Sequence, residues 1–113
     1  MHEMSLAEGV LDLVSEQARA GGYARVTGVW LEIGRLSGVE IEAMRFCFDA
    51  VVRGSVAEGA SLEIDETPGS AWCLACAASV TIGHRADPCP RCGGWQLRPN
   101  GGTEMRVREI EVE

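Results

Sequence analysis

Residues 72–94, WCLACAASVTIGHRADPCPRCGG, contain two C-x-x-C pairs, Cys73/Cys76 and Cys89/Cys92, which are separated by twelve residues. Two cysteines three positions apart on a tight turn bind one ion, and a second such turn completes a tetrahedral site with Zn–S bonds of roughly 2.3 Å. A segment this short cannot bury a hydrophobic core, so the ion itself must supply the folding free energy. The spacing therefore predicts a structural Zn2+ site.

Other uses of paired cysteines fit the sequence less well. A disulfide-stabilised secreted module is disfavoured because the first ten residues, MHEMSLAEGV, lack an apolar signal-peptide region, and because a fifth cysteine, Cys47, would be left over. A redox pair would open a helix in a βαβ unit, which neither pair does. Iron bound as in rubredoxin suits four sulfurs as well, but the first pair lacks the glycine that follows the second. The pattern favours zinc and a cytoplasmic location.

Charge and hydropathy exclude several classes of function. The 113-residue chain has a formal net charge of −7, and all ten of its basic residues are arginine. Such a chain repels phosphate backbones, and residues 72–98 offer only three arginines, so we expect no nucleic-acid partner. No apolar run approaches the roughly 20 residues that span a bilayer, so we expect no membrane association. The length allows one small domain plus the metal module.

Hydrophobic periodicity outside the cysteine segment predicts alternating helices and strands. Apolar residues at 3–4 spacing predict helices over 5–19 and from about 39 to 54, and capping-box patterns begin at Ser5 and Ser37. Cys47 lies on the apolar face of the second helix, which indicates a small core residue. Alternating apolar residues predict three strands, over 25–34, 61–67 and 104–112.

Breaker residues enclose the metal module at Pro68-Gly69 and again at 99–102, and they predict flexible joints. The chain then divides into a discontinuous α/β domain, residues 1–68 and 101–113, and a zinc-binding domain, residues 69–100. The element order predicts an α+β fold: a small three-stranded mixed sheet with two helices on one face, plus an inserted four-cysteine zinc-ribbon module.

The N-terminus, Met1-His2-Glu3, offers a second set of metal ligands. The Met1 amine, the deprotonated His2 amide and the His2 imidazole can chelate one ion in adjoining rings, with a fourth donor from the Glu3 backbone or carboxylate. Nitrogen donors in a plane suit Ni2+ or Cu2+. A helix that begins at Ser5 would leave residues 1–3 tethered but exposed. The alternative is a chance histidine at a solvated terminus.

Several separated motifs together resemble one family. MHEMSL at the start, VWLEIGRLSGVE at 29–40, the paired C-x-x-C segment and the closing REIEVE are similar to the HypA/HybF family, the nickel-insertion accessory proteins of [NiFe]-hydrogenase maturation. The resemblance covers essentially the whole chain. It implies a nickel-binding α/β domain with Met1, His2 and Glu3 as nickel ligands. It also implies structural zinc on the four paired cysteines.

The resemblance implies a non-enzymatic metallochaperone that carries Ni2+ as cargo to the large subunit of a [NiFe]-hydrogenase, in cooperation with the HypB GTPase. The resemblance is compatible with a homodimer. Some family members carry histidines beside the cysteine pairs, whereas Ala77 and Gly93 stand there in this chain. The remaining histidine, His84, is predicted to be a surface residue. The competing hypothesis is a zinc-ribbon adaptor that binds protein or nucleic acid without transferring metal.

Overall fold

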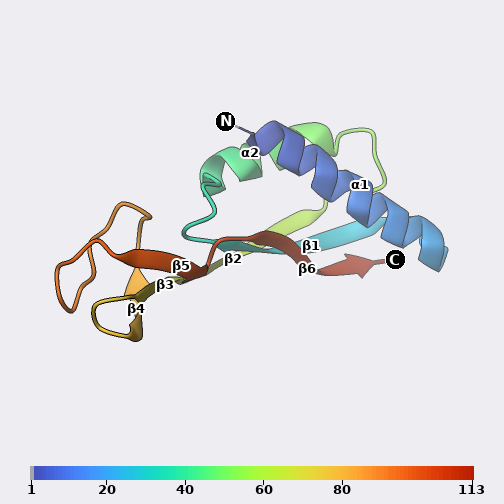
Figure 1. Ribbon diagram of the computed structural model, residues 1–113. Coiled ribbons are helices and arrows are strands. Elements are labelled where there is room, and N and C mark those ends of the chain that lie inside the picture. The colour runs from blue at the N-terminus through green and yellow to red at the C-terminus, as the bar shows by residue number, and fades with distance from the viewer. Residues whose placement is uncertain (1) are drawn as a thin grey trace. The chain divides into compact units, whose positions relative to one another are not determined.

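The computed structural model describes residues 2–113, and its element order is shown in Figure 1. The chain forms two compact units. The first comprises the residues up to Leu31, Val39–Asp65 and Arg106–Glu113, and the second comprises Glu32–Gly38 and Glu66–Met105. Neither helix within residues 2–113 is long and apolar enough to cross a membrane.

The first unit is built on a three-stranded sheet covered by two helices, which lie on the same side of it (Figure 1). Its elements follow one another as α1 (Glu3–Gly21), β1 (Val26–Gly34), α2 (Ile41–Val51), β2 (Ser61–Thr67) and β6 (Met105–Val112). The strand order is β2-β1-β6, and each strand continues at one end into residues of the second unit. The predicted alternation of helices and strands is confirmed.

Backbone hydrogen bonds define the strand directions. The Arg35 N–H donates to the Thr67 carbonyl at 3.0 Å, which joins the carboxyl ends of β1 and β2, so these strands are parallel. β6 is antiparallel to β1, because Gly34 N–H bonds the Glu104 carbonyl while Glu113 N–H bonds the Arg25 carbonyl at the opposite end. The sheet is therefore mixed, as the sequence predicts, and α2 supplies the crossover that parallel strands need.

Both predicted helix starts are wrong. α1 begins at Glu3, and its N-cap His2 makes no side-chain capping bond, so Ser5 lies inside the helix. α2 begins at Ile41, where the Glu40 carboxylate accepts hydrogen bonds from the amides of Glu42 and Ala43 at 3.0 and 3.4 Å. Glu40 itself therefore caps α2, whereas the capping-box pattern had assigned that role to Ser37.

The core of the first unit lies between the helices and the sheet. The buried side chains come from α1, β1 and α2 at helical or alternating spacing: Ala7, Val10, Val14, Ala18, Val26, Val29, Leu31, Met44 and Phe48. Cys47 is half-buried beside them. These contacts hold the starts of the two helices in fixed positions, which matters for the N-terminal residues below.

The second unit contains its own antiparallel sheet, in the order β4-β3-β5. The strands are β3 (Gly69–Cys73), β4 (Ala78–Ile82) and β5 (Leu97–Gly101). The predicted break at Pro99 does not end the strand, since Pro99 pairs with Ala71 inside β5, but the pairing is irregular there, with a register shift between the Ala71–Pro99 and Ser70–Gly101 pairs. Proline is tolerated there because β5 is an edge strand and needs fewer backbone donors.

Candidate metal centres

The structure brings the four paired cysteines together in the second unit. Their sulfur atoms all lie within 4.8 Å of one another, with 3.7 Å between Cys73 and Cys92 and 3.9 Å between Cys76 and Cys89. A tetrahedral ion with bonds of roughly 2.3 Å would hold its sulfurs about 3.8 Å apart. The spacing of these sulfurs therefore fits one Zn2+ ion.

Each cysteine pair lies on a turn whose backbone amides point at sulfur. The Cys76 amide donates to Cys73 Sγ, the Arg91 amide to Cys89 Sγ, and the Gly94 amide to Cys92 Sγ, each at 3.4 Å. These donors stabilise thiolate charge and orient the ligands, which is the usual second layer of a metal site.

The two turns differ at the residue that follows the second cysteine of each pair. Gly93 has φ +73, and Ala77 adopts the same left-handed region with φ 51. An alanine in this region is strained by roughly 1 kcal/mol or more. Although the first pair is followed by alanine and the second by glycine, both turns therefore have the same left-handed backbone conformation at this position. The chain forms the same turn at a cost.

Two thiols of the cluster have pKa values shifted in opposite directions. Amides of Cys92 and Arg91 lower the pKa of Cys89 to about 7. The neighbouring Cys92 side chain, together with burial, raises the pKa of Cys76 to about 12. The raised pKa keeps the Cys76 thiol protonated at neutral pH in the absence of a cation. A divalent cation reverses this by attracting all four.

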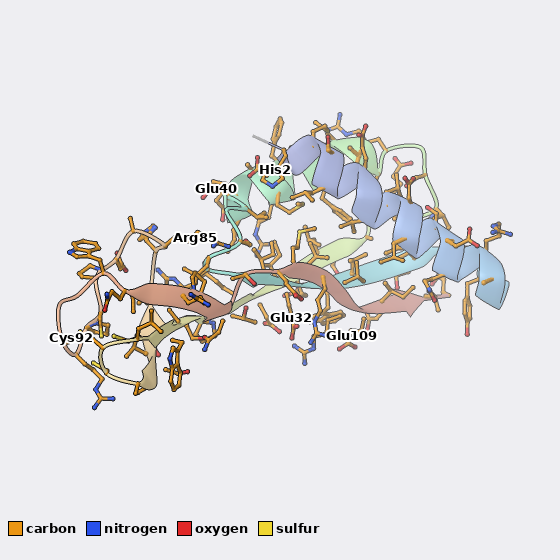
Figure 2. All side chains as sticks on the ribbon, viewed as in Figure 1. His2, Glu32, Glu40, Arg85, Cys92 and Glu109 are labelled. Atoms are coloured by element: carbon orange, nitrogen blue, oxygen red, sulfur yellow. The ribbon has the colours of Figure 1, made fainter. Side chains whose placement is uncertain are left out.

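The N-terminal candidates lie in the first unit. His2 is exposed and immediately precedes α1, as Figure 2 shows, while Met1 lies outside the described residues. The expectation that Glu3 is exposed is wrong, because its side chain is only 7% accessible. The Glu3 carboxylate accepts a 3.0 Å hydrogen bond from the Glu40 amide, which joins the starts of α1 and α2.

This contact sets the chemistry of Glu3. The hydrogen bond from the Glu40 amide is the largest of several interactions that lower the pKa of Glu3 from 4.5 to about 2, so its carboxylate is charged throughout the neutral range. No local sequence pattern identified Glu40 as the partner of Glu3, because the two residues are 37 positions apart. The arrangement places a fixed carboxylate directly after the exposed imidazole of His2.

The other histidine and the fifth cysteine lie outside both centres. His84 is exposed, as predicted, and it is not part of the four-cysteine group. Cys47 lies on α2 and is absent from that group as well. Both residues therefore serve as internal controls for the metal-binding experiments below.

Comparison with known proteins supports one family. Residues 1–112 match the model described as "HypA: Hydrogenase/urease nickel incorporation, metallochaperone, hypA". The chain is 65% identical over 113 residues to a protein named hydrogenase maturation factor HypA from Albidiferax ferrireducens, covering 100% of both. It is 58% identical over 113 residues to the protein of that name from Azotobacter vinelandii, again covering 100% of both.

Two solved structures share the fold. The chain superposes on the solution structure of the Ni metallochaperone HypA from Helicobacter pylori with a TM-score of 0.68 and 21% identity, covering 99% of this chain and 97% of that one. A second solution structure, titled HypA protein, gives a TM-score of 0.72 and 23% identity, covering 100% and 97%.

Proposed function

The chain belongs to the HypA family of hydrogenase/urease nickel incorporation metallochaperones, and from this premise we propose that it carries Ni2+ for assembly of the [NiFe]-hydrogenase active site. Its role is delivery of a metal ion and not catalysis of a reaction. The cargo site and the structural site are separate and share no ligand.

The proposal assigns one structural Zn2+ to Cys73, Cys76, Cys89 and Cys92. The observation that supports it is the cluster of four sulfurs within 4.8 Å of one another. A closed site of four thiolates exchanges its ion slowly, which suits a structural role and not delivery. Zinc fixes the fold of the second unit in this proposal.

The Ni2+ cargo binds at Met1, His2 and Glu3 through the terminal amine, the His2 amide and the His2 imidazole. The exposed position of His2 before α1 supports this assignment, because an open site can release its ion to a partner. The Glu3 carboxylate already accepts the Glu40 amide, so the fourth in-plane donor is the backbone of Glu3. The carboxylate then supplies nearby negative charge.

The partners that follow from this function are the large subunit of a [NiFe]-hydrogenase, which receives the ion, and the HypB GTPase. The site of action is the cytoplasm. Nickel transfer between the purified proteins, followed with a colorimetric chelator, tests both partners. If nickel is transferred no faster than it is released into buffer, the assignment of these two partners is wrong.

The deciding experiment is a Ni2+ titration of zinc-loaded protein with a native N-terminus. His2→Ala should abolish binding of about one equivalent, while His84→Ala, the matched change at the only other histidine, should leave it intact. Binding should strengthen as pH rises, because the amine, amide and imidazole must lose protons.

A short N-terminal extension provides the second arm of this experiment. It keeps every side chain but removes the free amine at Met1, so it should weaken nickel binding as severely as His2→Ala. Unaltered nickel affinity in either protein would show that the terminus is not the cargo site.

A further inference from the structure

A small cavity in the second unit has a lining unlike the rest of this acidic chain. It measures about 250 Å3 and lies between the turn at Arg35–Gly38 and the loop at His84–Arg85. Its lining includes two guanidinium groups, an imidazole and a serine, and it includes no carboxylate. Acidic residues outnumber basic ones by 17 to 10 in the chain, so this composition is a local departure.

The two walls of the cavity are held together by a specific contact. Arg85 Nε donates a 2.9 Å hydrogen bond to the Leu36 carbonyl. Leu36 is itself buried in the core of the second unit, so its carbonyl is a fixed acceptor. This bond uses one of the five N–H donors of Arg85 and leaves the outer edge of the guanidinium available to a ligand.

Nearby carboxylates do not fill the cavity. Asp87 Oδ2 accepts the amides of Gly83 and His84, both at 3.0 Å, and so shapes the loop. Glu66 lies 3.9 Å from Arg35, beyond hydrogen-bonding distance, and both side chains are about half exposed. An exposed pair at this separation is weak and leaves the Arg35 guanidinium able to bind another anion.

We infer that this cavity is a binding site for an oxyanion, either a phosphate monoester or a carboxylate. Planar guanidinium groups match the geometry of such oxyanions, because each can donate two parallel N–H bonds, and here one comes from the turn (Arg35) and one from the loop (Arg85). The volume accommodates one phosphate or one carboxylate-bearing side chain. The inference goes beyond nickel delivery and does not depend on it.

The test is a titration of zinc-loaded, 15N-labelled full-length protein with sodium phosphate and, separately, sodium acetate, each at constant ionic strength against sodium chloride. Saturable amide shifts at Ser37, Gly38 and Arg85 are expected with at least one of the two oxyanions and not with chloride. Saturation by phosphate alone assigns the site to phosphate monoesters, whereas saturation by acetate as well extends it to carboxylates.

Variants separate the pocket from general charge effects. Arg35→Gln and Arg85→Gln should each weaken the affinity about tenfold, the loss expected for one charge-assisted contact. Arg91→Gln and Arg98→Gln each remove one positive charge from the same unit but outside the cavity, so they should change the oxyanion affinity little. Arg35→Gln keeps the Arg85–Leu36 bond, so its effect does not depend on loop unfolding.

Two results would overturn the inference. One is a set of shifts that stay linear and equal in phosphate, acetate and chloride. The other is a loss in Arg91→Gln as large as that in Arg35→Gln, because non-specific screening then explains the binding.

Discussion

The two units of this protein are stabilised by different forces. The first packs aliphatic and aromatic side chains of two helices against a sheet. The second has a cluster of six buried residues, Leu36, Ala71, Cys73, Val80, Ile82 and Cys89, two of which are metal-ligand candidates. A cluster this small buries little apolar surface to offset chain entropy, so we expect the second unit to depend on a bound ion, whereas the first depends on the hydrophobic effect.

Charge divides between the units in the same way. The first unit contains 13 acidic and 6 basic residues and accounts for the whole net charge of −7, whereas the second contains four of each. An acidic unit concentrates cations around it, which suits the N-terminal candidate site for cargo. We expect the clustered thiolates of the neutral unit to require a bound cation. In the proposed function, attraction of the cargo ion and retention of the structural ion therefore fall to separate parts of one short chain.

The sharpest way to break this comparison is to remove zinc. Cys73→Ala or exhaustive chelation should unfold the second unit, because binding of structural zinc supplies about 10–16 kcal/mol in small zinc modules. The first unit should keep its helical circular dichroism, since its core contains no metal ligand. Zinc content and amide dispersion in NMR spectra measure the two effects.

Cys47→Ala is the matched control for zinc removal, since Cys47 is half-buried on α2 outside the cluster. It should keep one zinc per chain. A Cys73→Ala protein with full zinc content and native β3 amide signals would contradict the dependence of the second unit on the ion.

The next largest effect should come from the core of the first unit. Phe48→Ala removes a side chain that is only 2% exposed, and it should lower the free energy of unfolding by about 3–5 kcal/mol. Phe46→Ala changes the same residue type on the same helix where it is 74% exposed, and the cost should stay within about 0.5 kcal/mol. Urea unfolding followed by helical signal measures both; equal losses would refute this assignment of the core.

A smaller effect should reveal the contact between Glu3 and Glu40. Because the fold lowers the pKa of Glu3 from 4.5 to about 2, its carboxylate stabilises the folded state above pH 4.5, and this contribution is lost as pH falls from there towards 2. Glu3→Gln should therefore lower the melting temperature at pH 7, and the difference from the unsubstituted protein should shrink across that range.

Glu8→Gln is the matched control for Glu3, because Glu8 is exposed on the same helix. Its melting temperature should follow that of the unsubstituted protein at every pH. If both substitutions have the same pH dependence, general charge on α1 is responsible and the specific contact is not.

The smallest expected effect sharpens the comparison within the second unit. Ala77→Gly should relieve the left-handed backbone of the first cysteine turn and raise zinc affinity about two- to fivefold. Gly93→Ala introduces the same strain into the second turn and should lower it. Competition with a chromophoric chelator resolves changes of this size. The two variants must change the zinc affinity in opposite directions for this interpretation of the strain to hold.

Local sequence patterns predicted much of the fold. The spacing of the four paired cysteines predicted their cluster, and alternating apolar residues predicted β2 with the bounds that the structure has, Ser61–Thr67. These predictions succeed because each depends on residues within a few positions of one another, where helical or extended periodicity determines which side chains share a face.

The predictions failed where a distant residue decides the outcome. The capping-box pattern at Ser5 placed the start of the first helix too late, since α1 begins at Glu3. A local capping pattern contains no information about the contact of Glu3 with the distant Glu40. Pro99 signalled a break, yet pairing with β3 makes it part of an edge strand. Propensity is a weak determinant, and tertiary contacts override it.

The sequence by itself thus determined the metal-ligand candidates, the order of helices and strands in the first unit, and the family, because covalent spacing and periodicity are properties of the chain. Only the tertiary structure decided which distant groups meet. It joined the Glu3 carboxylate to the Glu40 amide and clamped Arg85 to the Leu36 carbonyl, across 37 and 49 positions. Such contacts arise from packing of whole elements, and no local pattern encodes them.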